Sequence, residues 1–102
     1  MLIHEEEPLT QLVTSSGSAS FNTIKFSGVK LSLIYVKFDT DKTTFDLRMT
    51  DRNDRDIYHN KGLESPYREQ IAIPLKGIYT VRVQNASNDE NVDVMLSATE
   101  GN

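Results

Sequence analysis

The stretch from Phe45 to Thr50 has the sequence FDLRMT, in which apolar and polar side chains alternate strictly. Successive side chains of a β-strand point to opposite faces, so this pattern predicts a strand with one buried face and one solvated face. Similar alternation recurs in three further stretches, Val29–Leu33, Tyr79–Gln84 and Val92–Ala98. Four such stretches predict an all-β fold in which antiparallel strands cover one core.

Turn residues divide the whole chain into seven or eight short strands, and no stretch has a convincing helical period. Regularly spaced short strands are typical of an antiparallel β-sandwich, here expected to be jelly-roll-like. Tyr79 is expected in the core, and Pro74 at an edge or a strand end. The strand candidates are Leu9–Thr14, Phe21–Phe26, Val29–Phe38, Thr43–Thr50, Asp56–His59, Gln70–Ile73, Gly77–Asn85 and Val92–Ala98.

Two connections are predicted from the same pattern. Residues 60–69 are polar and contain Gly62 and Pro66, so a loop is expected there. The last two strand candidates are expected to form a hairpin, which could place Arg82 opposite Asp93.

The chain is expected to form one domain with an amino-terminal extension. Its 102 residues are enough for a single modest core. Residues 14–20 are almost all small, which indicates a loop or flexible joint. We therefore expect an arm with a Ser/Gly joint over residues 1–20 and a β-sandwich domain over residues 21–102.

Composition excludes several classes of function. The net charge of −4 argues against sequence-independent nucleic-acid binding, which needs a dense positive surface. The absence of cysteine excludes disulfides and thiolate-ligated zinc. The first residues are acidic and lack the apolar segment of a signal peptide, and the stretch Val29–Phe38 is too short to span a bilayer. Neither a nucleic-acid nor a membrane partner is expected.

The longest strand candidate, Val29–Phe38, is apolar on both faces. Such a strand is covered on both sides, bulged, or half of an interface. The amino-terminal segment or a second subunit could supply the cover. The residues proposed on this basis to contact a partner are Leu9, Leu12, Val13, Ile34, Val36 and Phe38.

The sequence nominates no catalytic centre. His4 and His59 are the only histidines, and neither has a second histidine at a metal-ligand spacing. There is no Gly-x-Ser-x-Gly motif, no facing carboxylate pair can be named, and the five glycines are isolated, which excludes a glycine-rich phosphate loop. We expect a protein that is not an enzyme and has no cofactor.

The acidic turn at residues 51–56 is the best candidate for a metal site. Asp51, Asn53, Asp54 and Asp56 supply the oxygen ligands that calcium prefers. However, the pattern of a calcium-binding EF-hand loop fails at Arg55, and Asp and Asn also build ordinary turns. A hairpin turn and a calcium site both stay open, and no metal ligand is assigned.

Exposed aromatic residues would indicate carbohydrate binding, because sugar rings stack on them. The chain has no Trp, and Tyr67, which lies between Pro66 and Arg68, is the tyrosine most expected to be exposed. Tyr67 is therefore a further candidate partner-contact residue. A carbohydrate-binding or adhesive module, such as a tail-fibre or host-recognition piece, is the alternative function.

The order of motifs in the carboxyl-terminal two thirds resembles two families. The motifs are Thr44–Asp51, Asp56–Tyr58, Pro74–Val81 and Asn85–Ser87. They are similar to small β-sandwich virion proteins of tailed, especially marine, bacteriophages, including head decoration proteins. They also resemble, more weakly, the bacterial pre-peptidase carboxyl-terminal domain, a secreted jelly-roll module. Neither resemblance implies catalytic residues.

The phage resemblance implies a non-enzymatic structural virion protein, most concretely a capsid decoration or cement protein. Its expected partners are the major capsid protein, copies of itself, or both, as a homo-oligomer or bound to the lattice. It would be made in the host cytoplasm and reside on the capsid surface. Many weak apolar contacts would then add up through avidity.

Overall fold

The computed structural model describes residues 4–100, and their backbone confirms the all-β prediction. No helix occurs in this part of the chain, and therefore none that could cross a membrane. The eight strands are β1 (His4–Val13), β2 (Ala19–Asn22), β3 (Phe26–Phe38), β4 (Thr44–Thr50), β5 (Asp56–Glu64), β6 (Tyr67–Gly77), β7 (Thr80–Gln84) and β8 (Asn91–Glu100).

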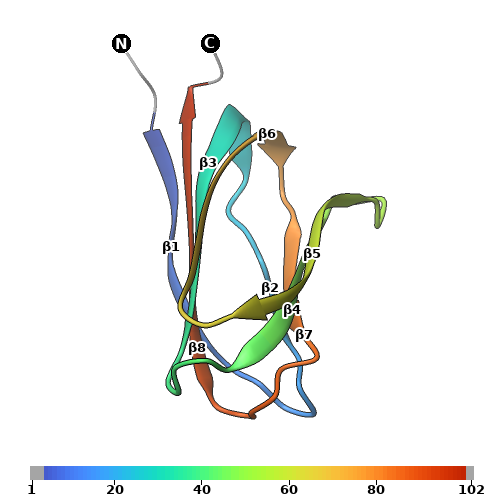
Figure 1. Ribbon diagram of the computed structural model, residues 1–102. Coiled ribbons are helices and arrows are strands. Elements are labelled where there is room, and N and C mark those ends of the chain that lie inside the picture. Colours follow the sequence, from blue (N-terminus) through green and yellow to red (C-terminus); the bar gives the residue numbers. More distant parts are fainter. Residues whose placement is uncertain (1–3, 101–102) are drawn as a thin grey trace.

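The strands form two four-stranded antiparallel sheets that pack face to face (Figure 1). One sheet has the order β1-β8-β3-β6 and the other β2-β7-β4-β5. The first strand thus pairs with the last, the second with the seventh, the third with the sixth and the fourth with the fifth. This is the winding of a jelly roll, in which a long antiparallel ribbon folds over onto itself.

The core lies between the sheets and is built by the alternation seen in the sequence. In β4, Phe45, Leu47 and Met49 are buried, and in β7 so are Val81 and Val83. Each such side chain contributes on the order of 1.5–3 kcal/mol when it leaves water. The alternating side chains between them are consequently placed on the outer face of the β2-β7-β4-β5 sheet.

Tyr79 lies in the core, as predicted, with only 7% of its surface exposed. Its hydroxyl accepts a hydrogen bond from the Lys76 amide at 2.7 Å and donates to the Lys76 carbonyl at 3.1 Å. A buried phenol needs such partners, because an unpaired hydroxyl would cost stability.

A β-bulge in β3 explains why this strand is apolar on both faces. Its pairing with both neighbours shifts register between Leu31 and Leu33. Before the bulge Val29 and Leu31 are buried, and after it the inward positions are those of Ile34, Val36 and Phe38. An extra residue in a strand exchanges the faces of everything that follows it.

The prediction that Ile34, Val36 and Phe38 contact a partner is therefore wrong for this fold. At most 1% of each side chain is exposed, because the opposite sheet of the same chain covers them. Of the three explanations offered by the sequence, the bulge is the correct one.

The segment predicted as an arm is an edge strand over His4–Val13. β1 pairs antiparallel with β8 from His4↔Thr99 to Val13↔Asn91, so it belongs to the domain's own sheet. The connection that follows is held by hydrogen bonds between the backbones of Ser15 and Ser18. Residues 1–3 lie outside the described part of the chain.

Two predicted connections differ in the structure. The loop expected over residues 60–69 is strand on both sides of a tight turn at Ser65 and Pro66, because β5 extends to Glu64 and β6 starts at Tyr67. Both are edge strands with many exposed polar side chains. The alternation of apolar and polar residues is therefore weak in their sequence. Pro74 lies within β6, on an edge strand as expected.

The prediction that the last two strands form a hairpin is also wrong. β7 and β8 belong to different sheets, so Arg82 does not face Asp93. Arg82 lies opposite Arg48 of β4, and Asp93 pairs with Gln11 and Lys37. In this jelly roll most consecutive strands lie in opposite sheets, with β4 and β5 as the exception. Alternation of side chains alone does not reveal which strands pair.

Candidate functional site

The outer face of the β2-β7-β4-β5 sheet carries a row of polar side chains that includes two arginines. Register places Ser20 of β2 opposite Arg82 of β7, Arg82 opposite Arg48 of β4, and Arg48 opposite His59 of β5. Directly opposed residues have Cα atoms about 5 Å apart, and like charges in that position destabilise a sheet. This row therefore requires anionic or polar neighbours.

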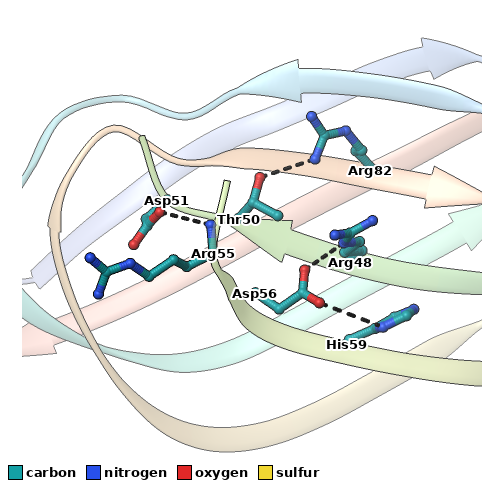
Figure 2. A network of polar contacts seen from close by, with 7 residues as sticks. All are labelled: Arg48, Thr50, Asp51, Arg55, Asp56, His59 and Arg82. Atoms are coloured by element: carbon teal, nitrogen blue, oxygen red, sulfur yellow. Dashed lines mark hydrogen bonds and ion pairs between the residues drawn. The ribbon is translucent and has the colours of Figure 1, made fainter. Parts of the chain in front are cut away.

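Asp56 supplies negative charge at one end of the row (Figure 2). One of its carboxylate oxygens accepts a hydrogen bond from Arg48 Nε, and the other lies 4.0 Å from His59 Nδ1. About a third of the Arg48 side chain and two fifths of the Asp56 side chain are exposed, so solvent screens this ion pair. A single carboxylate thus lies within reach of both Arg48 and His59.

Arg82 is held differently. Its Nη1 donates a hydrogen bond to the Thr50 hydroxyl at 3.0 Å, as Figure 2 shows. Within the described residues, this is the one hydrogen bond that the Arg82 side chain makes. Thr50 itself is buried, with 1% of its surface exposed. No carboxylate within the described residues forms an ion pair with Arg82. Within the described part of the chain, Arg82 therefore has a neutral hydrogen-bond partner and no carboxylate partner.

Asp46, a second carboxylate on β4, already accepts hydrogen bonds from other groups. It lies opposite Gln84, accepts a hydrogen bond from Asn85 Nδ2 at 2.7 Å and another from the Gly62 amide at 3.0 Å. These bonds, that from Asn85 first, lower the pKa of Asp46. Asp46 is thus an anion whose hydrogen bonds join β4 to Gly62 of β5 and to the β7–β8 connection.

An open hollow of about 330 Å³ borders Arg82 between β2 and β7. Its polar lining residues are two serines, a glutamine and Arg82, and no aromatic residue lines it. Its lining residues are Ser18, Ala19, Ser20, Arg82, Val83 and Gln84. The hollow and the arginine row together are the strongest candidate binding site on the described surface.

The acidic turn at residues 51–56 is organised by Asp51 rather than by a metal-like arrangement. Asp51 Oδ1 accepts hydrogen bonds from the backbone amides of Asn53 at 2.8 Å and Arg55 at 3.0 Å. The bond from Arg55 contributes most to the lowered pKa of Asp51. Among the described residues, no three acidic or histidine side chains cluster closely enough to hold a metal ion.

A polar network at the opposite end of the sandwich ties three connections together. Glu90 accepts hydrogen bonds from Thr40 and Thr43, and the buried Thr14 exchanges hydrogen bonds with the Glu90 backbone. Asp89 accepts from the amides of Ser16 and Gly17. Sequence reasoning missed this network, because its members are common turn residues far apart in the chain.

Tyr67 does not present a free ring. It packs edge-on against the core residue Phe45, with ring centroids 6.2 Å apart, and its hydroxyl lies 3.0 Å from that of Tyr58. Tyr58 also donates to Glu69 at 3.2 Å, and burial raises the pKa of Tyr58. This cluster bridges β5 and β6 at the side where the two sheets meet.

The remaining candidate contact residues come from β1. Leu12 packs partly against the core, whereas Val13 is 67% exposed. The side chain of Leu9 lies outside the described part of the structure. Ile24 and Ile78, which the sequence did not nominate, are exposed by 37% and 42%.

Comparison with known proteins assigns no family. No family model matches the chain, and no curated protein is similar in sequence. Solved structures of infectious bursal disease virus, strains Gx and Gt, align with it at TM-scores of 0.40 and 0.36 and identities of 8% and 9%. The alignments cover 97% and 98% of this chain but 31% and 32% of those chains, so this chain spans about a third of their length. Similarity this low assigns no function.

Proposed function

We propose that this chain is a non-enzymatic structural protein of a virus particle, most concretely a decoration protein on the outer lattice of a bacteriophage capsid. The observation that carries the proposal is the strand order β1-β8-β3-β6 and β2-β7-β4-β5. Viral capsid domains commonly use this jelly-roll winding, although the fold also serves lectins and cupins. The phage resemblance of the strand-and-turn motifs points in the same direction.

The distribution of polar groups supports a packing role over a catalytic one. Among the described residues, the buried polar side chains are those of threonine and serine, and none is acidic or basic. Enzymes shift the pKa of catalytic groups by burying them. Among the described residues, each carboxylate with a lowered pKa accepts hydrogen bonds that hold a turn or join neighbouring segments.

The contact surface proposed from the sequence has to be revised. Ile34, Val36 and Phe38 are buried in the core, so the partner contact would use exposed apolar side chains instead. Within the described residues these include Val13, Ile24 and Ile78. Each would contribute little alone, and many copies on a lattice would add their contributions.

Quantitative mass spectrometry on gradient-purified particles tests this function. Hundreds of copies per particle that co-sediment with a major capsid protein would support a lattice component. A dozen or fewer copies would contradict decoration and point to a tail or vertex component. Absence from particles would overturn the virion role altogether.

A binding test follows on particles that lack the protein. Val13→Asp should weaken rebinding to such particles, whereas Ala72→Asp, which adds the same charge at an exposed position of β6, serves as the control. Equal rebinding of the Val13→Asp variant and the parent would exclude Val13 from the contact.

The alternative function, carbohydrate binding through Tyr67, has less support from the geometry. A sugar ring needs an accessible aromatic face, and Tyr67 is half-buried against Phe45 with its hydroxyl engaged by Tyr58. A polar ligand would find a better site on the β2-β7-β4-β5 sheet.

A further inference from the structure

We propose that the hollow between β2 and β7, together with Arg82 and Arg48, binds a small polyhydroxylated anion, namely a sugar acid or a sugar phosphate. The site goes beyond the structural role proposed above and does not depend on it. The chemistry that recognises the ligand is an oxyanion held by arginine, with hydroxyl groups held by serine and glutamine.

The first step is the charge of the row. Arg48 and Arg82 lie directly opposite each other on neighbouring strands. Their Cα atoms are therefore about 5 Å apart. Asp56 compensates Arg48, while Arg82 has only the neutral Thr50 hydroxyl among the described residues. An oxyanion beside Arg82 would remove the repulsion that like charges in this position create.

The second step is that, among the described residues, the carboxylates of β4 and β5 on this sheet do not fill this role. Asp56 is bound to Arg48 and close to His59, and both oxygens of Asp46 accept hydrogen bonds from Asn85 and Gly62. A guanidinium has five N–H donors, so Arg82 retains several for a ligand. Arginine binds carboxylate and phosphate groups in a two-pronged geometry.

The third step is the shape and lining of the hollow. Its volume of about 330 Å³ falls at the lower end of the range for small-ligand sites. Ser18, Ser20 and Gln84 offer groups that both donate and accept hydrogen bonds, as sugar hydroxyls require. The lack of an aromatic ring disfavours a neutral sugar, which would depend on stacking. The anion is therefore the decisive part of the ligand.

Nuclear magnetic resonance on the full chain tests the site. The Nε–Hε resonance of Arg82 is followed while glucuronate, glucose 6-phosphate or glucose is added at constant ionic strength. We expect at least one of the two acids to bind tenfold more tightly than glucose. Preference for glucuronate identifies a carboxylate ligand, and preference for glucose 6-phosphate identifies a phosphate. Failure of both acids, or binding of glucose as tight as theirs, would overturn the proposal.

Matched variants separate a built site from general charge attraction. Arg82→Gln should weaken binding of the preferred acid at least tenfold. Arg52→Gln, which removes the same charge from the exposed β4–β5 turn, should change it less than twofold. Ser20→Asp places a carboxylate opposite Arg82 and should abolish binding while the thermal melt stays cooperative. An equal loss in Arg52→Gln, or full binding by Ser20→Asp, would contradict the site.

Discussion

Glu90 accepts two hydrogen bonds from Thr40, one from its backbone amide at 3.1 Å and one from its hydroxyl at 2.7 Å. The Thr43 hydroxyl donates a third at 2.9 Å. These bonds hold the turn between β3 and β4 against the segment that enters β8. They also lower the pKa of Glu90, with the Thr40 side chain as the largest cause.

Replacement of this carboxylate should make stability less dependent on pH. The folded pKa of Glu90 lies below the unfolded value, so its charge stabilises the fold above the unfolded pKa near 4.5. That contribution is lost as the pH falls through the lower, folded pKa. Glu90→Gln should therefore have its largest deficit in melting temperature at neutral pH, and the deficit should shrink as the pH falls below 4.5. Thermal melts across this range, with the exposed Glu64→Gln as control, measure it. A deficit of constant size would refute the assignment.

The bulge in β3 predicts unequal effects for two leucines that a regular strand would treat alike. Leu31 has no exposed surface, whereas Leu33, two residues later, is only partly buried. Leu31→Ala should reduce the free energy of unfolding by about 3 kcal/mol, within the usual range for a buried leucine. Leu33→Ala should cost about 1 kcal/mol or less. Urea denaturation of both variants measures the difference, and equal losses would rule out the bulge at this position.

Removal of β1 should damage the domain itself. β1 pairs with β8 along most of its length, and Leu12 packs against the core. Deletion of residues 1–13 exposes the edge of β8, whose inward side chains Val92, Val94 and Leu96 are central to the core. We expect loss of cooperative unfolding or a strongly lowered melting temperature, measured by circular dichroism. Deletion of residues 1–3 alone is the control. A truncated chain that melts like the parent would restore the hypothesis of a detachable arm.

Local alternation was enough to predict the sandwich, because Phe45, Leu47 and Met49 must share one face of any strand they form. The sequence offered a bulge as one of three explanations for β3, but it could not select the bulge or place it at Leu31–Leu33, since that depends on how β6 and β8 pair with β3. The hydrogen bonds of Glu90 with Thr40 and the contact of Arg82 with Thr50 join residues far apart in sequence. Such contacts follow from the jelly-roll winding, which short-range sequence patterns do not predict.

The ion pair of Arg48 with Asp56 should contribute little to stability. Both side chains are partly exposed, and exposed pairs are typically worth about 0.2–1 kcal/mol. Asp56→Asn should therefore lower the free energy of unfolding by no more than about 1 kcal/mol. The loss should shrink further in high salt, because ions screen the pair. Urea denaturation at low and high salt checks this, and a larger loss that salt leaves unchanged would argue for a buried interaction instead.

Two substitutions of Tyr67 distinguish a structural role of its ring from a role in glycan binding. Tyr67→Phe removes only the hydroxyl that meets Tyr58, and should cost about 1 kcal/mol. Tyr67→Ala also removes the ring that packs against Phe45, and should cost about 3 kcal/mol. Urea denaturation gives both values, and retention on immobilised glycans is measured in parallel. If Tyr67→Ala kept its stability but lost retention that Tyr67→Phe preserved, the ring would be an exposed sugar platform. Stability losses in the predicted order, with no change in retention, would assign Tyr67 to the closure of the sandwich between β5 and β6.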